Sequence, residues 1–170
     1  MPAIWSVILR KNVAFYTIPG YIIDAGLCLP AEAGDMHARD AATAKPDVRA
    51  NQQAATTPAH ELISRLREVL GAPLTMYLTD VRDVRTLDRW AAKADVPPLQ
   101  VRRLQAAYAA ALVLQRRYAD PVHIATWFTW LAETLDDVSP AAYLRAAADL
   151  EDAENRARAV LRAARLYLAD

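Results

Sequence analysis

Residues 98–118 read PLQVRRLQAAYAAALVLQRRY. This stretch decides the fold class, because Leu104, Tyr108 and Ala111 recur at helical spacing along one apolar stripe. Alanine, the strongest helix former, supplies much of the 54% hydrophobic content. The chain has only four glycines and two phenylalanines, which gives little support to a β-sandwich or a glycine-looped nucleotide fold. We predict an all-α protein.

Helix starts are marked on both sides of this stretch by one rule. Thr57, Asp120 and Ser139 each precede a proline, which suits an N-cap residue followed by a proline that needs no amide donor. Gly71 is expected to end the first helix. The sequence predicts helices over residues 58–71, 73–78, 84–94, 98–118 and 121–134, and one or two helices over 140–168.

The 170 residues suffice for one domain with an appendage. We expect an irregular N-terminal extension and flexible tether over 1–57, and helical regions over 58–118 and 119–170. Within the extension, the aromatic and β-branched residues 1–34 predict either a small hairpin or an early start codon, with Met36 the true initiator. The polar, alanine-rich residues 34–57 predict a disordered tether.

The formal net charge is zero and the isoelectric point is near 6.8, so nucleic-acid binding would need a local basic patch. The stretch DVRDVRTLDRW, residues 80–90, offers one. With Asp83 as N-cap, the helix starts at Val84 and carries its basic residues on one stripe. That stripe consists of Arg85, Arg89 and Lys93, opposite a face of Val84, Leu87, Trp90, Ala91 and Ala94.

A short helix, a tight turn and a second helix with a basic outer face form the helix-turn-helix pattern. Arg85 and Arg89 are the candidates for base edges or phosphates, and Thr86 for either. Arg82 and Lys93 are candidates for phosphates. The alternative is a solvated surface helix, which has the same polar outer face. The glycine usual in the turn is missing, and Val81 stands near its place.

Catalysis and cofactors have no support in the sequence. The three histidines are scattered and show no ligand spacing, so no metal is expected. No nucleotide-binding glycine motif occurs. No apolar run is long enough to span a bilayer, and Cys28 is alone, which favours a reducing compartment. We expect a cytoplasmic protein that is not an enzyme and has no membrane partner.

Three blocks in order, TDVRDVRTLDRW (79–90), VPPLQVRRLQAAYAAALVL (96–114) and HIATWFTWLAETLDDVSPAAYL (123–144), resemble the Xre/MbcA/ParS-type antitoxins. The resemblance spans residues 58–168. The matching residues are Arg89-Trp90, Arg103-Leu104, Trp127, Pro140 and Leu144. One departure is Leu131-Ala132, where the family usually has Pro-Asn, which puts the local turn in doubt.

The resemblance implies a helix-turn-helix over 58–118 and a helical toxin-binding domain over 119–170. Such an antitoxin binds a RES-domain toxin that consumes NAD, encoded by the adjacent gene. Its C-terminal end obstructs the toxin's active-site pocket, and the complex, a dimer or larger assembly, binds operator DNA at its own promoter. Carried over to this chain, the toxin-binding candidates are Trp130, Arg165, Leu166, Tyr167, Leu168 and Asp170.

Two alternatives stay open for the C-terminal region. Its last residues could simply pack the final helix onto the core, and the whole chain could be a stand-alone regulator whose C-terminal domain only dimerises. In the aromatic helix, Trp127 is expected in the core. Phe128 and Trp130 point elsewhere and are candidates for a dimer or toxin interface, where aromatic residues are enriched.

Overall fold

A computed structural model describes residues 7–10, 13–18, 21–24, 46–93 and 95–169, with the side chains of the strands, Pro46 and Lys93 left aside. The chain divides into two compact units, Met1–Ala44 and Lys45–Asp170. In the first unit, β1 (Val7–Arg10), β2 (Val13–Ile18) and β3 (Tyr21–Asp24) pair antiparallel in sequence order. The N-terminal extension, which was expected to be irregular, therefore contains a three-stranded antiparallel meander within residues 7–24. Antiparallel pairing of neighbouring strands is what the hairpin alternative predicted.

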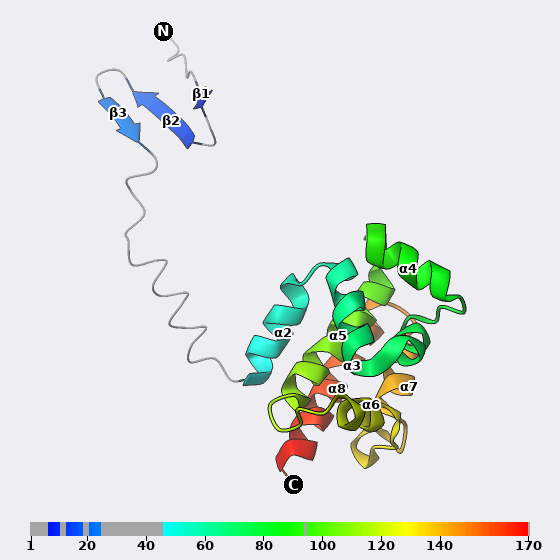
Figure 1. Ribbon diagram of the computed structural model, residues 1–170. Helices are drawn as coiled ribbons and strands as arrows, with labels where there is room; N and C mark the ends of the chain where they lie inside the picture. Colours follow the sequence, from blue (N-terminus) through cyan, green and yellow to red (C-terminus); the bar gives the residue numbers. More distant parts are fainter. Residues whose placement is uncertain (1–6, 11–12, 19–20, 25–45, 94, 170) are drawn as a thin grey trace. The chain divides into compact units, whose positions relative to one another are not determined.

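The second unit is all-α, as predicted (Figure 1). Its short loops carry only one isolated β-bridge among the described residues, between Ala132 and Val138. The α-helices are α2 (Pro46–Thr56), α3 (Ala59–Thr79), α4 (Val84–Lys93), α5 (Pro98–Leu114), α6 (Pro121–Thr129), α7 (Pro140–Arg145) and α8 (Leu150–Ala169), with a 3-10 turn η1 (Glu133–Leu135).

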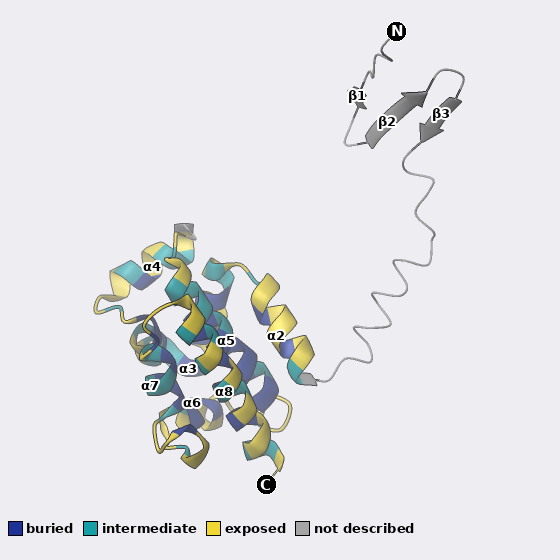
Figure 2. Ribbon diagram, turned by 180° about the vertical axis from the view of Figure 1, so that it is seen from behind, coloured by how far each residue is buried: buried dark blue, intermediate teal, exposed yellow. Residues whose placement is uncertain are grey.

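Helix α5 is the centre of this unit, and buried residues gather along it in Figure 2. Its residues 106–111 are five alanines and Tyr108, all of them buried. Small side chains let α2, α3 and α8 pack closely around one helix. Larger side chains from the surrounding helices, among them Leu62, Leu66 and Phe128, fill the space between them.

The tether predicted over residues 34–57 is wrong for 46–56, which form α2. Ala50 and Ala54 are buried against the core, at 6% and 0% exposure. The segment has no large apolar residues at helical spacing. It can still pack as a helix, because the small alanine side chains of α5 leave room for the equally small alanine face of α2. An ion pair of 2.8 Å between Asp47 and Arg165 ties α2 to α8.

Two of the three predicted N-caps are confirmed. The Asp120 carboxylate accepts a hydrogen bond from the Val122 amide at 2.9 Å, and the Ser139 hydroxyl accepts one from the Ala142 amide at 3.3 Å. The prediction for Thr57 is wrong, since its hydroxyl donates to the Gln53 carbonyl at 2.7 Å. Residue 57 is engaged by the end of α2, the helix that the sequence did not reveal.

The predicted stop at Gly71 is present as a sharp kink within α3. Gly71 has φ 81° and ψ 161°, outside the helical region, and Pro73 follows. A β-carbon there would meet Pro73 at an ordinary 3.7 Å, so backbone conformation rather than space favours glycine. Two predicted helix ends are too late: α5 ends at Leu114 rather than residue 118, and α6 ends at Thr129 rather than Thr134.

The regions 58–118 and 119–170 share one core. Helix α3 packs on both α6 and α7, and α5 packs on α8. A single cluster of buried residues runs from Leu62 in α3 to Ala164 in α8. A change at either end of this unit therefore reaches the other through continuous packing.

Candidate nucleic-acid interface and partner surface

The turn between α3 and α4 is built on Asp80. This residue has left-handed φ and ψ of 55° and 31°. The Val81 amide donates to the Met76 carbonyl at 3.0 Å, and the Asp80 amide donates to the Tyr77 carbonyl at 3.2 Å. This is the Schellman arrangement that often ends helices on glycine. Asp80 takes the place of the missing glycine, because aspartate tolerates the left-handed region better than most residues.

We expect Asp80→Gly to be more stable than Asp80→Ala by about 1 kcal/mol. Both variants lose the carboxylate, so their difference reports only the left-handed backbone. Urea unfolding followed by helical circular dichroism measures it. Equal stability of the two variants would show that the turn relaxes out of the left-handed conformation.

A cation from α7 holds the same turn. The Arg145 guanidinium donates to the Asp80 carboxylate at 2.5 Å and lies 4.5 Å from the centre of the Tyr77 ring. These contacts raise the pKa of Arg145, the Asp80 hydrogen bond being the largest cause. Beside them, Arg103 of α5 is 7% exposed and donates to the Ala147 carbonyl at 2.7 Å. Burial lowers the pKa of Arg103. The turn before α4 is thus tied to α7 by a side chain.

The inner face of α4 seats the helix much as predicted. Leu87 is fully buried, and Trp90 and Ala91 are half-buried against the core. Asp83 is the N-cap, its carboxylate accepting from the Arg85 amide at 2.9 Å. Val84 was expected on the apolar face, but it is 43% exposed at the first position of α4.

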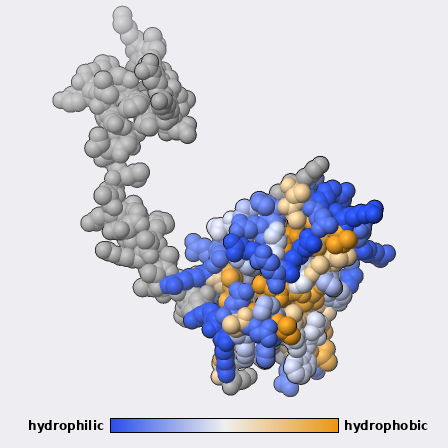
Figure 3. Space-filling view, viewed as in Figure 1, coloured by the Kyte–Doolittle hydropathy of each residue, from blue (hydrophilic) through white to orange (hydrophobic). Residues whose placement is uncertain are grey.

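The acidic residue of α4 is engaged within the chain, whereas the arginines are not. Asp88 pairs with Arg67 of α3 at 2.7 Å. Arg82, Arg85 and Arg89 are exposed, and no described residue forms an ion pair or hydrogen bond with their side chains. Thr86 is half-buried beside them. The side chain of Lys93 lies outside the described part of the chain. In Figure 3 the part of the helical unit where α4 lies in Figure 1 is mainly hydrophilic, with some hydrophobic residues among the hydrophilic ones.

The partner candidates do not all share one environment. Trp130 is 67% exposed and Leu166 44%. Tyr167 and Leu168 are half-buried against the core, which fits the alternative in which they pack the last helix. Arg165 is exposed but paired with Asp47 on α2. Asp170 lies outside the described residues.

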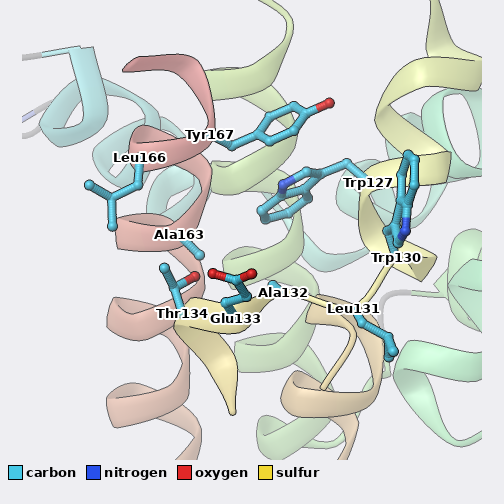
Figure 4. Close-up of a pocket in the computed structure, with 9 residues that line it drawn as sticks. All are labelled: Trp127, Trp130, Leu131, Ala132, Glu133, Thr134, Ala163, Leu166 and Tyr167. Atoms are coloured by element: carbon cyan, nitrogen blue, oxygen red, sulfur yellow. The ribbon is translucent and has the colours of Figure 1, made fainter. Parts of the chain in front are cut away.

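Three of these side chains and the loop after α6 surround a hollow of about 380 Å³. Figure 4 shows the indole of Trp127 between the Tyr167 ring and the Glu133 carboxylate, with Trp130 on one side and Leu166 on the other. The ring centres of Trp127 and Tyr167 are 6.3 Å apart. Burial is the largest cause that raises the pKa of Tyr167. The remaining lining residues are Leu131, Ala132, Thr134 and Ala163.

The loop that forms this hollow ends α6 without a proline. Trp130 is extended, with φ −81° and ψ 148°, so α6 has ended before Leu131. The Ala132 amide donates to the Val138 carbonyl at 3.4 Å and closes the loop across η1. A proline is therefore not required to stop α6, and Leu131 is left 67% exposed.

Trp127 is buried as predicted, but the prediction for Phe128 is wrong. Phe128 is fully buried and packs edge-on against Trp127, with ring centres 5.1 Å apart. Both fit because α6 packs on α3 as well as α7. Glu133 and Leu131 were missed as surface residues of interest. The signal that pointed to them was the pair of adjacent large apolar residues, Trp130 and Leu131, just before an acidic stretch.

Searches against protein-family models, curated proteins and solved structures match nothing. The described part of the chain holds no group of three or more histidine, cysteine, aspartate or glutamate residues placed to bind a metal. Of its helices, none combines the length and the apolar character needed to cross a membrane.

Proposed function

We propose that this chain is the antitoxin of a toxin–antitoxin pair, which binds operator DNA through α4 and a RES-type NAD-degrading toxin through the surface around Trp130 and α8. The resemblance of residues 58–168 to Xre/MbcA/ParS-type antitoxins supports both parts. The two surfaces lie on different elements of one compact unit, so DNA and toxin need not compete for the same residues.

One observation carries the DNA-binding half. Arg85 and Arg89 extend from α4 and Arg82 from the turn just before it, while the neighbouring acid Asp88 is engaged by Arg67. An approaching phosphate backbone would therefore meet cations with no partner among the described residues, and the net charge of the stretch understates that attraction.

The direct test is co-expression with the product of the adjacent gene. We expect this chain to suppress the toxicity of that product and to co-purify with it as a stable complex. Trp130→Ala should weaken the complex, and Val122→Ala, an equally exposed apolar truncation at the start of α6, should not. Undiminished toxicity on co-expression would contradict the proposal.

A stand-alone helix-turn-helix regulator is the second candidate. The exposed pair Trp130 and Leu131, both at 67%, favours it as well, because self-association would cover them. Sedimentation of the purified chain separates the two functions. A tight dimer that binds its upstream DNA, in a genome without a neighbouring RES-domain gene, is the expected result for the regulator alone.

A further inference from the structure

We propose that the hollow between α6, η1 and α8 binds a lysine or arginine side chain of a partner protein, presented by a segment whose neighbouring residues are apolar. The inference deepens the proposed function and rests on it, since it specifies what the toxin-binding surface recognises. It is argued from the rings, the carboxylates and the exposed apolar residues around the hollow.

The rings supply the first part of the argument. Trp127 of α6, Trp130 just after α6 and Tyr167 of α8 line one space, as Figure 4 shows. The faces of aromatic rings attract cations, most strongly in tryptophan, and clusters of such rings bind ammonium groups. Trp127 is only 6% exposed, and its indole N–H has no hydrogen-bond partner among the described residues but stays within reach of water. A backbone carbonyl of a bound segment would take the place of that water.

The carboxylates supply the second part. Glu133 lines the hollow, and Asp136 and Asp137 follow in the same loop, all three exposed. No described side chain forms an ion pair or hydrogen bond with any of them, in contrast to Asp80, Asp88 and Asp152, which are each paired with an arginine. The loop therefore presents unneutralised negative charge beside aromatic faces, which is complementary to a cation and unfavourable for an anion.

A neighbouring hollow carries the other sign. Arg162 lines the adjoining hollow, which shares Thr134, Ala163 and Leu166 with the first. A cationic group would be repelled by Arg162, so it is expected in the first hollow, beside Glu133, and not in its neighbour.

The exposed apolar residues decide between a protein segment and a free small cation. Trp130 and Leu131 are both 67% exposed at the rim, and Figure 4 shows Leu131 extending away from the rings. A small ammonium ion would occupy only part of the hollow and leave both side chains in water. A polypeptide with apolar residues next to its cation would cover them, and burial of adjacent apolar area stabilises such a complex.

The test uses the full chain and short, end-capped peptides, each with one central residue flanked by leucine and phenylalanine. The central residue is arginine or lysine, or their neutral counterparts citrulline and norleucine. Fluorescence anisotropy of labelled peptides gives Kd. We expect the cationic peptides to bind about 5-fold more tightly than the neutral ones. Glu133→Gln should reduce that preference, with the rings retaining part of it, while the matched exposed change Glu68→Gln leaves it intact.

Trp130→Ala should weaken all of the peptides, because it removes both a ring and apolar area. Equal binding of the arginine and citrulline peptides would overturn the inference, as would a preference that is undiminished in Glu133→Gln. A dimer that Trp130→Ala dissociates in sedimentation would overturn it too, by assigning the surface to a second copy. The peptide experiment does not use the toxin. A lack of cationic preference in the peptides can therefore be distinguished from a failure of this chain to co-purify with the toxin.

Discussion

Phe128→Ala is expected to destabilise the helical unit by about 3 to 5 kcal/mol. The side chain is fully buried in α6 and its ring packs edge-on against Trp127. Truncation removes apolar contacts and leaves a cavity, because α3 and α7, packed on the same helix, cannot both move inward. Urea unfolding followed by helical circular dichroism gives the free energy of unfolding.

The matched control is Trp130→Ala, two residues further along. Trp130 is 67% exposed, so its loss should change the free energy of unfolding by no more than about 0.5 kcal/mol. Where Phe128→Ala leaves too little folded protein to measure, Phe128→Leu retains most of the volume and is expected to cost about 1 kcal/mol. If Trp130→Ala were less stable than the Phe128 variant, the assignment of Phe128 as buried and Trp130 as exposed would be contradicted.

The helical architecture is readable from the sequence where apolar periodicity and capping chemistry agree. Asp120 and Ser139 precede prolines and cap α6 and α7, and Gly71 breaks α3 where expected. Each of these signals is local, because a cap or a break depends on residues within one turn of the chain. Local signals survive folding when no distant contact opposes them.

The errors arose where tertiary packing decides. Residues 46–56 show no apolar stripe, yet α2 forms because the alanines of α5 accept Ala50 and Ala54 at close range. Thr57 has the sequence pattern of an N-cap, but in the structure its hydroxyl donates to a carbonyl of α2. Phe128 sits one position from Trp127, and helical spacing alone directed only one of them inward. Which faces of a helix are covered depends on how many neighbours it has, and a single segment does not reveal that number.

The candidate site was readable in the same uneven way. The seating of α4 on Leu87 and the exposure of Arg85 and Arg89 follow from helical periodicity. Helical periodicity does not reveal that Asp88 is paired with Arg67 and so does not neutralise Arg85 or Arg89, because Arg67 and Asp88 are 21 residues apart in sequence. Likewise the bond between Arg145 and Asp80 joins residues 65 apart. Long-range pairing of this kind is invisible to patterns within a window.

Simultaneous Arg85→Ala and Arg89→Ala substitution is expected to weaken binding to the DNA upstream of this gene by about 10-fold to 100-fold. If both arginines contact phosphates, the slope of log K against the logarithm of the salt concentration should also become shallower by about 1.8, since each phosphate contact contributes about 0.9 to that slope. Gel shifts or anisotropy across a series of salt concentrations measure both quantities. The fold should be unaffected, because neither side chain has an intrachain partner among the described residues.

The control for lost charge is Arg116→Ala with Arg162→Ala, which removes two exposed cations outside α4. If only net charge mattered, both double variants would weaken binding equally, because each removes two positive charges from a chain of zero formal net charge. If α4 is the interface, the control retains the affinity and the salt slope of the unmodified chain. A loss of affinity with an unchanged slope in the α4 variant would indicate base-edge contacts, since those release no counterions. Unchanged affinity would leave α4 as a solvated helix held in place by Leu87, and the unpaired arginines as ordinary surface residues.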